Sequence, residues 1–450
     1  MLNELFGTDG IRGIANKDLT PEMAFYIGRI CTYLLRKEEE DMQEPFIVLG
    51  KDTRRSCNML EGALTAGICS SGMNVRSLGV LSTPALAYLT KELNAAAGIM
   101  ISASHNPIED NGLKIFSPTG YKIADDIENN IEDIYFGEDP LPRPIGGEIG
   151  KLEEDEHAAH IYLEFLQKSA PSLDGMHIAM DCGHGAVYEL APELFRSLGA
   201  RLTVLNNQPN GVNINVKCGS TNPSALQSAV LENNAHLGLA FDGDADRLIA
   251  VDEKGEIVDG DLLMLIFSLH LQEKNLLNKN TLVSTIMSNG GLEIAANRHG
   301  IDVVRTKVGD RYVLEKMREG GFSLGGEQSG HIIFFDYATT GDGLLSALKL
   351  TEIVKEKGQP LSSYRSLMPH LPQVMVNCQV NKKEGWDKIP AFQKAMEETY
   401  TKIGPNGRIL VRPSGTESKI RIMVEGEEEE NVLHNYAKEL ADILSKELNS

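Results

Sequence analysis

Four short stretches of the sequence gather residues whose types and spacing could do chemistry. They read SASHNP at 102–107, DGDADR at 242–247, GGEQSGH at 325–331 and RPSGTES at 412–418. Each follows a short apolar run of the kind that forms a strand. In α/β domains, catalytic and binding side chains gather in loops beyond the carboxyl ends of strands. The four stretches are therefore the candidate site loops.

Three aspartates alternate in the second loop, at Asp242, Asp244 and Asp246. Alternate side chains of an extended segment share a face, so the three carboxylates should converge. Converging carboxylates repel one another unless a cation lies between them, and Mg²⁺ prefers oxygen ligands. The spacing also resembles a calcium EF-hand loop with Glu253 at the twelfth position, but Arg247 stands where that loop requires glycine. An acidic turn satisfied by backbone N–H groups is the alternative to a magnesium site.

The first loop offers serines as nucleophiles but has no hydrolase signature, because a G-x-S-x-G elbow is absent. His105 directly follows Ser104, and neighbours on an extended chain point to opposite faces. His105 is therefore predicted to be poorly placed as a base for that serine. A serine close to a carboxylate-bound Mg²⁺ suits another role, because the metal can neutralise phosphoryl oxygens during transfer. The loop is predicted to carry a phosphoryl group.

The third loop has the residues of a sugar site. Gly325 and Gly326 allow a tight backbone, and Glu327, Ser329 and His331 could face one cavity. Such side chains suit the neutral hydroxyls of a polyol. A glycine-rich turn without a ligand is equally compatible with the pattern.

The fourth loop predicts phosphate binding. Arg412, Ser414, Gly415 and Thr416 follow a strand, and Arg421 lies on the next one. Hydroxyls, exposed amides and a guanidinium fork are what a phosphate dianion requires. The alternative is a capped turn with a surface arginine, which the second arginine nearby makes less favourable.

The composition excludes some classes of function. A length of 450 residues predicts several domains, and 42% hydrophobic with 24% charged residues is typical of a soluble globular protein. The net charge of −21 argues against nucleic-acid binding, because a phosphate backbone needs a basic surface. A small anionic ligand needs only a local cluster of cations and N–H groups.

Cysteine usage and hydropathy predict a cytoplasmic protein without a membrane partner. The six cysteines are scattered and form no C-x-x-C pair, which is typical of reduced thiols. The N-terminus lacks the basic and apolar regions of a signal peptide. No apolar stretch approaches the ~20 residues of a membrane span.

The elements that must position the loops alternate between apolar strands and amphipathic helices, which predicts an α/β fold. Strands are expected at 45–54, 74–80, 95–103, 176–182, 201–206, 237–242, 281–287 and 302–308. Thr20 before Pro21 predicts a helix start, and Thr83 before Pro84 repeats that signal. Gly358 predicts the end of a helix over 342–358.

The last part of the chain changes to an α+β pattern. Strands are expected at 374–380, 407–413 and 419–426, followed by an amphipathic helix over 431–448. The acidic run at 425–431 is interpreted as a solvated helix cap. The predicted domains are three α/β domains at 1–153, 154–250 and 251–368 and an α+β domain at 369–450.

With the four loops in this order, the chain resembles the α-D-phosphohexomutase superfamily, from FGTDGIRG at 6–13 to RPSGTES at 412–418. The resemblance implies three similar α/β domains with mixed sheets and a smaller fourth domain, around a central active-site cleft. It implies a phosphoryl group on Ser104, and Mg²⁺ held by that phosphoserine with the three aspartates. The implied activity is intramolecular phosphotransfer on a phosphohexose.

The resemblance also implies roles for residues around the phosphoserine. Arg12 and Lys114 would lie at the reacting phosphoryl group, and Lys114 or His331 would act as general acid or base. Glu327 and Ser329 would bind sugar hydroxyls. Further substrate contacts are implied for His105, Arg247, Lys307, Arg412, Ser414, Gly415, Thr416 and Arg421, of which the last five would grip the phosphate that is not transferred.

Finer features resemble the branch that acts on glucosamine phosphates, namely Gln328 within GEQSG and the stretches STIMSNGGLE, NINVKCGST and TKVGDRYV. Ser418 and the pair Gly183-His184 depart from that branch, but none of them is an expected catalytic residue. The implied reaction converts glucosamine 6-phosphate reversibly into glucosamine 1-phosphate through a 1,6-bisphosphate, for UDP-N-acetylglucosamine and cell-wall synthesis. One Mg²⁺ per subunit, glucosamine or glucose 1,6-bisphosphate as priming activator, and a homodimer complete the expectation.

Two alternatives remain open. A member of the same superfamily that acts on mannose or glucose phosphates would carry the same four loops. A non-catalytic phosphosugar-binding protein on this fold would not need Ser104, the three aspartates and Lys114 together.

Overall fold

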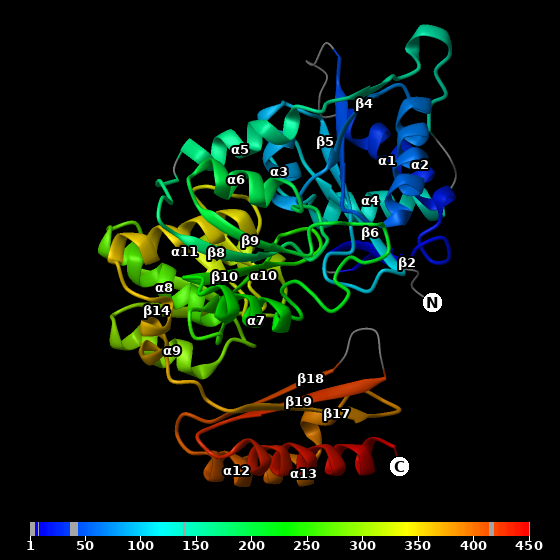
Figure 1. Cartoon of the computed structure of the whole chain (residues 1–450). Coiled ribbons are helices and arrows are strands. Elements are labelled where there is room, and N and C mark those ends of the chain that lie inside the picture. The colour runs from blue at the N-terminus through cyan, green and yellow to red at the C-terminus, as the bar shows by residue number, and fades with distance from the viewer. Residues whose placement is uncertain are drawn as a thin grey trace. The chain divides into compact units, whose positions relative to one another are not determined.

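The computed structural model describes residues 5–7, 9–36, 44–137, 141–168, 170–413 and 418–449. The chain forms two compact units (Figure 1). One consists of Met1–Met287 with Ile301–Arg365, and the other of Ser288–Gly300 with Ser366–Ser450. No helix within the described ranges has the length and apolar character that crossing a membrane requires.

The first part of the larger unit holds a mixed sheet, whose described strands lie in the order β1-β2-β6-β5-β3-β4-β7. Strands β3, β4, β5 and β7 run parallel, and β1, β2 and β6 add antiparallel pairs. The strands are β1 (Phe6–Gly7), β2 (Gly10–Ile14), β3 (Phe46–Lys51), β4 (Asn74–Val80), β5 (Ala97–Ile101), β6 (Asp110–Phe116) and β7 (Leu152–Glu154). The helices are α1 (Pro21–Arg36), α2 (Arg55–Ser70), α3 (Thr83–Glu92) and α4 (Asp125–Phe136).

Two helix starts in this part are set by their caps. Thr20 caps α1 as predicted, because its hydroxyl accepts from the Met23 amide at 3.2 Å. Helix α3 is capped by Ser82, whose hydroxyl accepts from Ala85 N, so the cap predicted at Thr83 is wrong by one residue. The Thr83 hydroxyl is used elsewhere, in the candidate site.

The second sheet has the order β12-β11-β10-β8-β9. Its strands are β8 (His177–Asp181), β9 (Arg201–Leu205), β10 (Leu237–Phe241), β11 (Leu248–Asp252) and β12 (Ile257–Val258). The helices of this part are α5 (Ala158–Lys168), α6 (Leu190–Ser197) and α7 (Ser224–Asn233). Strands β10 and β11 pair antiparallel with Phe241 opposite Leu248, so residues 242–247 form a hairpin loop.

The third sheet has the order β14-β13-β15-β16. Its strands are β13 (Thr281–Thr285), β14 (Asp302–Thr306), β15 (Leu324–Gly326) and β16 (Ile332–Phe334). The helices α8 (Gly260–Glu273), α10 (Asp310–Gly320) and α11 (Gly343–Lys357) belong to the same unit. Helix α11 ends at a left-handed Gly358, as predicted.

The smaller unit is an α+β structure. A sheet in the order β17-β19-β18 carries α12 and α13 on one face (Figure 1). The elements are β17 (Gln373–Gln379), β18 (Arg408–Pro413), β19 (Lys419–Glu425), α12 (Pro390–Ile403) and α13 (Glu430–Leu448). Helix α9 (Gly290–Arg298) also belongs to this unit, although its sequence lies between β13 and β14.

One sequence interpretation fails in the smaller unit. Glu425, read as part of a solvated acidic cap, is fully buried. Its carboxylate accepts from Arg408 Nε at 2.7 Å and from the Gly290 amide at the start of α9 at 3.0 Å. The charge is buried because it joins α9 to the sheet. The mixed α/β architecture with a small α+β domain is confirmed.

Candidate active site

The three aspartates converge, but not for the reason predicted. One carboxylate oxygen from each of Asp242, Asp244 and Asp246 lies within 4.8 Å of the others. The segment is a hairpin loop rather than an extended strand, and Ala245 has a left-handed φ of 53°. The turn, not strand alternation, brings the carboxylates together.

The carboxylates leave oxygens free for a cation. The Oδ1 atoms of all three aspartates are buried and have no hydrogen-bond partner among the described residues. Their Oδ2 atoms are engaged: Thr83 and Lys114 contact that of Asp244 at 2.5 and 2.9 Å. Burial and the neighbouring carboxylates raise the pKa of Asp242 well above its ordinary value, so its ionised form needs positive charge nearby. Three hard oxygen donors in a buried loop fit a divalent cation.

Ser104 lies against this group. Its hydroxyl donates to Asp242 Oδ2 at 2.5 Å, and the two residues are 138 positions apart in the sequence. The backbone of Ser104 is left-handed, with φ of 51°. The chain is therefore not extended here, and His105 Nδ1 lies 3.2 Å from Ser104 Oγ. The argument that His105 points away from this serine is wrong.

His105 is nevertheless a poor base. Burial, together with the positive charges of Arg247 and Arg12, lowers the pKa of His105 to about 4. At neutral pH the imidazole is uncharged, and its conjugate acid is too strong to hold a proton taken from a hydroxyl. His105 suits neutral hydrogen bonding to a substrate.

Lys114 is the central cation of the site. It lies on β6, almost fully buried, with Nζ 2.9 Å from Asp244, 3.1 Å from Asp9 and 3.3 Å from Asp246. Burial by itself would lower its pKa, but the three carboxylates outweigh it and raise the pKa well above the ordinary value. In this arrangement Lys114 is an ammonium, which can donate a proton but cannot accept one.

Arg12 and Arg247 bring two guanidinium groups with unused donors. The Nε atom of each is buried and has no hydrogen-bond partner among the described residues. Arg12 pairs with Asp9 through another nitrogen, and Arg247 Nε lies 3.7 Å from Asp246 Oδ1. A buried N–H without an acceptor is costly, and an anion in the site would remove that cost.

His331 directly precedes β16 and contacts Gly341, just before α11, and Asp246 in the hairpin loop of the second sheet. Its Nε2 accepts from the Gly341 amide at 3.0 Å, and its Nδ1 lies 3.6 Å from Asp246 Oδ2. Burial opposes protonation, but the Asp246 and Asp310 carboxylates outweigh it and raise the pKa of His331. The Gly341 contact favours the tautomer with the proton on Nδ1, facing Asp246.

The third loop has one open polar group. Ser329 Oγ is buried and lacks a hydrogen-bond partner among the residues described. Glu327 accepts from the Gly309 amide at 3.1 Å, which ties the loop to the start of α10. Lys307 is exposed, with Nζ 5.7 Å from the centre of the Tyr312 ring. The serine thus offers a hydroxyl to a ligand.

In the smaller unit, Arg412 of β18 lies directly opposite Arg421 of β19 in the antiparallel register. Like charges directly opposite on paired strands repel, so this pair favours an anion. Ser414, Gly415 and Thr416, which the fourth-loop prediction includes, lie outside the described residues.

Sequence reasoning missed several residues of this site. Asp9 contacts Lys114 and Arg12, and it also pairs with Lys122, which reaches Asp310 at 2.5 Å. Asp52 and Arg54 follow β3 as polar residues after an apolar strand, which is the signal used for the other loops. That signal was available in the stretch GKDTR at 50–54.

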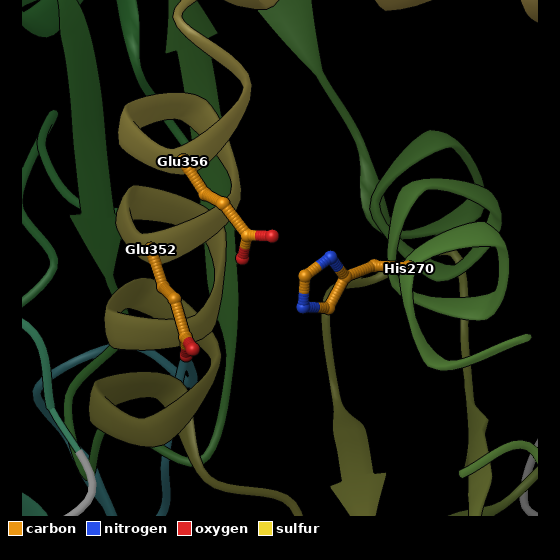
Figure 2. Close-up of side chains that lie close together, drawn as sticks. All are labelled: His270, Glu352 and Glu356. Carbon is orange, nitrogen blue, oxygen red and sulfur yellow. The ribbon is translucent and has the colours of Figure 1, made fainter. Parts of the chain in front are cut away.

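A second group of metal-ligating side chains lies between α8 and α11 (Figure 2). His270 faces Glu352 and Glu356, and one ligand atom of each lies within 4.8 Å of the others. Lysines already pair with both carboxylates, Lys349 with Glu352 at 2.9 Å and Lys274 with Glu356 at 2.6 Å. The first pair lies within α11 and the second joins the end of α8 to α11. These ammonium groups neutralise the glutamates, so the group is explained by ion pairing.

Family models match nearly the whole chain. Their descriptions are phosphoglucomutase/phosphomannomutase alpha/beta/alpha domain I at 3–141, domain II at 156–255, domain III at 259–371 and C-terminal domain at 375–443.

Several relatives are named phosphoglucosamine mutase, among them the following two. That of Shouchella clausii is 48% identical over 448 residues, covering 99% of this chain and 100% of the relative. That of Symbiobacterium thermophilum is 50% identical over 446 residues, covering 99% of both. The solved structure of a phosphoglucomutase/phosphomannomutase family protein from Burkholderia thailandensis has a TM-score of 0.81 at 24% identity and covers 98% of both chains, which shows a shared fold.

Proposed function

The chain belongs to the phosphoglucomutase/phosphomannomutase family, and on that premise we propose that it is a phosphoglucosamine mutase. Relatives of that name are 48% and 50% identical to it over nearly their full length. The observation that carries the proposal is the 2.5 Å contact between Ser104 Oγ and Asp242, beside three buried carboxylate oxygens without hydrogen-bond partners in the described chain. A phosphoryl group on that serine would meet the cation those oxygens bind.

The reaction interconverts glucosamine 6-phosphate and glucosamine 1-phosphate. In the first half, the bond between phosphorus and Ser104 Oγ breaks and a bond to the free sugar oxygen forms. The sugar hydroxyl loses a proton and the serine oxygen takes one up. The resulting 1,6-bisphosphate reorients, and Ser104 Oγ accepts the other phosphoryl group. Each half is a balanced transfer, so the enzyme ends phosphorylated as it began.

Mg²⁺ is the proposed metal, because it prefers hard oxygen donors. Asp242, Asp244 and Asp246 would hold it together with an oxygen of the phosphorylated Ser104. When bound, it would supply charge neutralisation for the phosphoryl oxygens.

The basic side chains around Ser104 are proposed to have different roles in the transfer. We assign Arg12 and Arg247 to the transferring phosphoryl group, since their Nε donors have no hydrogen-bond acceptor in the described chain. As an ammonium, Lys114 stabilises the developing charge, a role that its raised pKa supports, and it remains a candidate general acid. His331 is the remaining acid–base candidate, and its Nδ1 proton also orients Asp246.

Other residues would recognise the sugar and its second phosphate. Ser329 and Glu327 are proposed for sugar hydroxyls, and Lys307 and His105 for further substrate contacts. Arg412 and Arg421 are proposed to bind the phosphate that is not transferred, together with the loop residues Ser414, Gly415 and Thr416. A site made of separate polar contacts can accept the bisphosphate in both orientations.

The substrate assignment is tested by comparing kcat/KM for glucosamine, glucose and mannose 1-phosphates, with Mg²⁺ and glucose 1,6-bisphosphate present. Glucosamine 1-phosphate should be preferred. A clear preference for mannose or glucose phosphate would move the protein to another branch of the family.

Phosphate transfer itself is tested by intact-mass measurement after treatment with glucose 1,6-bisphosphate. The wild-type protein should gain one phosphate and the variant Ser104→Ala none. A wild-type protein that never gains phosphate would instead be a phosphosugar-binding protein. The same proposal includes priming by glucosamine or glucose 1,6-bisphosphate and a cytoplasmic location. It also includes a homodimer, which light scattering after gel filtration tests.

A further inference from the structure

Arg54 is a buried arginine whose every donor is occupied. Arg54 is only 2% exposed to solvent. Nε donates to Asp52 at 3.0 Å, and the two terminal nitrogens donate to four backbone carbonyls at 2.5–3.1 Å. Those carbonyls belong to Ser104, Asn106, Pro107 and Asp110. A guanidinium has five N–H donors, so none is left for a ligand.

Asp52 extends the same network to the other side of the serine peptide. Its Oδ2 accepts from Ser102 Oγ at 2.6 Å as well as from Arg54. Ser102 Oγ in turn accepts from the Ser104 amide at 2.9 Å. Both ends of Ser104 are therefore held, the amide through Ser102 and Asp52, and the carbonyl by Arg54 and, at 2.8 Å, by Asn215 Nδ2.

The held conformation is one that serine rarely adopts. Ser104 has φ of 51°, where a Cβ atom crowds the backbone, so the residue needs surrounding contacts to stay there. In this conformation Oγ reaches Asp242. A relaxed backbone at Ser104 would turn the hydroxyl away from the aspartates.

We propose that Arg54, braced by Asp52, is a positioning residue that fixes the Ser104 loop in the conformation from which phosphoryl transfer occurs. The inference rests on the proposed function and deepens it. Arg54 differs from Arg12 and Arg247, which keep a buried Nε without a hydrogen-bond partner in the described chain, because it has no donor to offer a phosphate. Lysine cannot replace it, since an ammonium lacks the planar fork that reaches several carbonyls at once.

The variant Arg54→Lys tests this, with Arg55→Lys as the matched control. Arg55 is the next residue, and its side chain is exposed. Arg54→Lys should lower kcat about 100-fold, because small misplacements of a reacting atom are costly. Its KM for glucosamine 1-phosphate should stay within about twofold of wild type, because no substrate contact is lost. Single-turnover phosphorylation of Ser104 by glucose 1,6-bisphosphate should slow in parallel.

Hydrogen exchange gives a readout that does not depend on activity. Amides in residues 102–110 should exchange faster in Arg54→Lys than in wild type, while the rest of the chain is unchanged. Faster exchange throughout would mean a general loss of folding and would overturn a specific positioning role. A raised KM with kcat retained would also overturn it, because Arg54 would then be a substrate ligand.

Ser102→Ala is a second variant, which removes the acceptor of the Ser104 amide and the hydroxyl donor to Asp52 but keeps Arg54. It should lower kcat about tenfold, again with KM retained. Activity equal to wild type in both variants would contradict the proposal. If the wild-type protein never takes up phosphate, the proposed function fails, whereas the exchange comparison still decides whether Arg54 holds the loop.

Discussion

At the scale of single residues, the site is defined by buried polar atoms that have no hydrogen-bond partner among the described residues. Three carboxylate oxygens and two arginine Nε donors are buried without hydrogen bonds in the described chain. Leaving such groups unsatisfied costs about 1–3 kcal/mol each, and more for charged groups. The folded site is therefore less stable than one with every polar atom satisfied, and a bound cation and anion would remove that cost.

Asp242→Asn should separate the effect of this carboxylate on activity from its effect on stability. The substitution removes an anionic metal ligand, so activity should fall at least about 100-fold. The metal-free variant should be as stable as wild type or more stable, because ionised Asp242 is disfavoured by burial and by Asp246 and Asp244. Thermal unfolding with and without Mg²⁺ measures this: Mg²⁺ should raise the Tm of the wild type and not that of the variant. Asp302→Asn, at an exposed position, is the control.

At the scale of elements, the start of α11 couples a helix cap to a buried acid. Asp342 caps the helix by accepting from Leu345 N at 2.9 Å and also accepts from the Tyr162 hydroxyl at 2.7 Å. Burial raises the pKa of Asp342 to about 6, despite these contacts. Burial therefore favours the protonated form of the Asp342 carboxyl.

The sign of the resulting pH dependence follows from linkage. The folded state keeps the Asp342 proton up to about pH 6, whereas the unfolded state releases it near pH 4, so stability falls as pH rises through this window. The loss is at most about 3 kcal/mol. Asp342→Asn keeps the cap and should remove this part of the slope in urea unfolding between pH 4 and 7. An unchanged slope would contradict the raised pKa.

The turn that ends the third loop should tolerate no side chain. Gly330 has φ of 91°, and a Cβ there would lie 2.1 Å from the Leu248 carbonyl oxygen. Gly321 has φ of 65° with nothing within 4 Å of its Cβ position. Gly321→Ala should cost about 1 kcal/mol from backbone strain alone, and Gly330→Ala about 3 kcal/mol or more. Equal losses in urea unfolding would show that the close contact relaxes.

At the scale of the whole molecule, the smaller unit has its own core and its own buried charge. Residues from its sheet, α12 and α13 form one hydrophobic cluster. Helix α9 joins it through Glu425 and through Asn289, which donates to the Leu371 carbonyl at 2.8 Å and accepts from its amide at 3.1 Å. A mutation that destabilises the smaller unit should therefore leave the stability of the larger unit unchanged.

Glu425→Gln should destabilise the smaller unit by about 2 kcal/mol, because it removes the charge that pairs with Arg408. Hydrogen exchange should speed up in α9 and in residues 366–449 and stay unchanged in the larger unit. Glu428→Gln, from the same acidic run but exposed, should have no effect. Faster exchange across the larger unit as well would contradict separate units.

Local sequence determined most of the elements and the residue types that the loops carry. Strand β4 begins and ends where the sequence predicted, and the capping residues Thr20 and Gly358 mark the expected helix ends. The three aspartates were recognisable from the sequence because three closely spaced carboxylates repel one another unless a cation lies between them. Such features depend on neighbours within a few positions, so periodicity and residue type are sufficient to predict them.

Only the tertiary structure decided how these groups meet. The left-handed backbone at Ser104 depends on Arg54, 50 positions earlier in the chain. The same backbone placed His105 beside the serine. Glu425 is buried where its carboxylate accepts from the Gly290 amide at the start of α9, 135 positions away in the sequence. Backbone strain and buried charge are stabilised by contacts between distant segments, and those contacts exist only once the chain has folded.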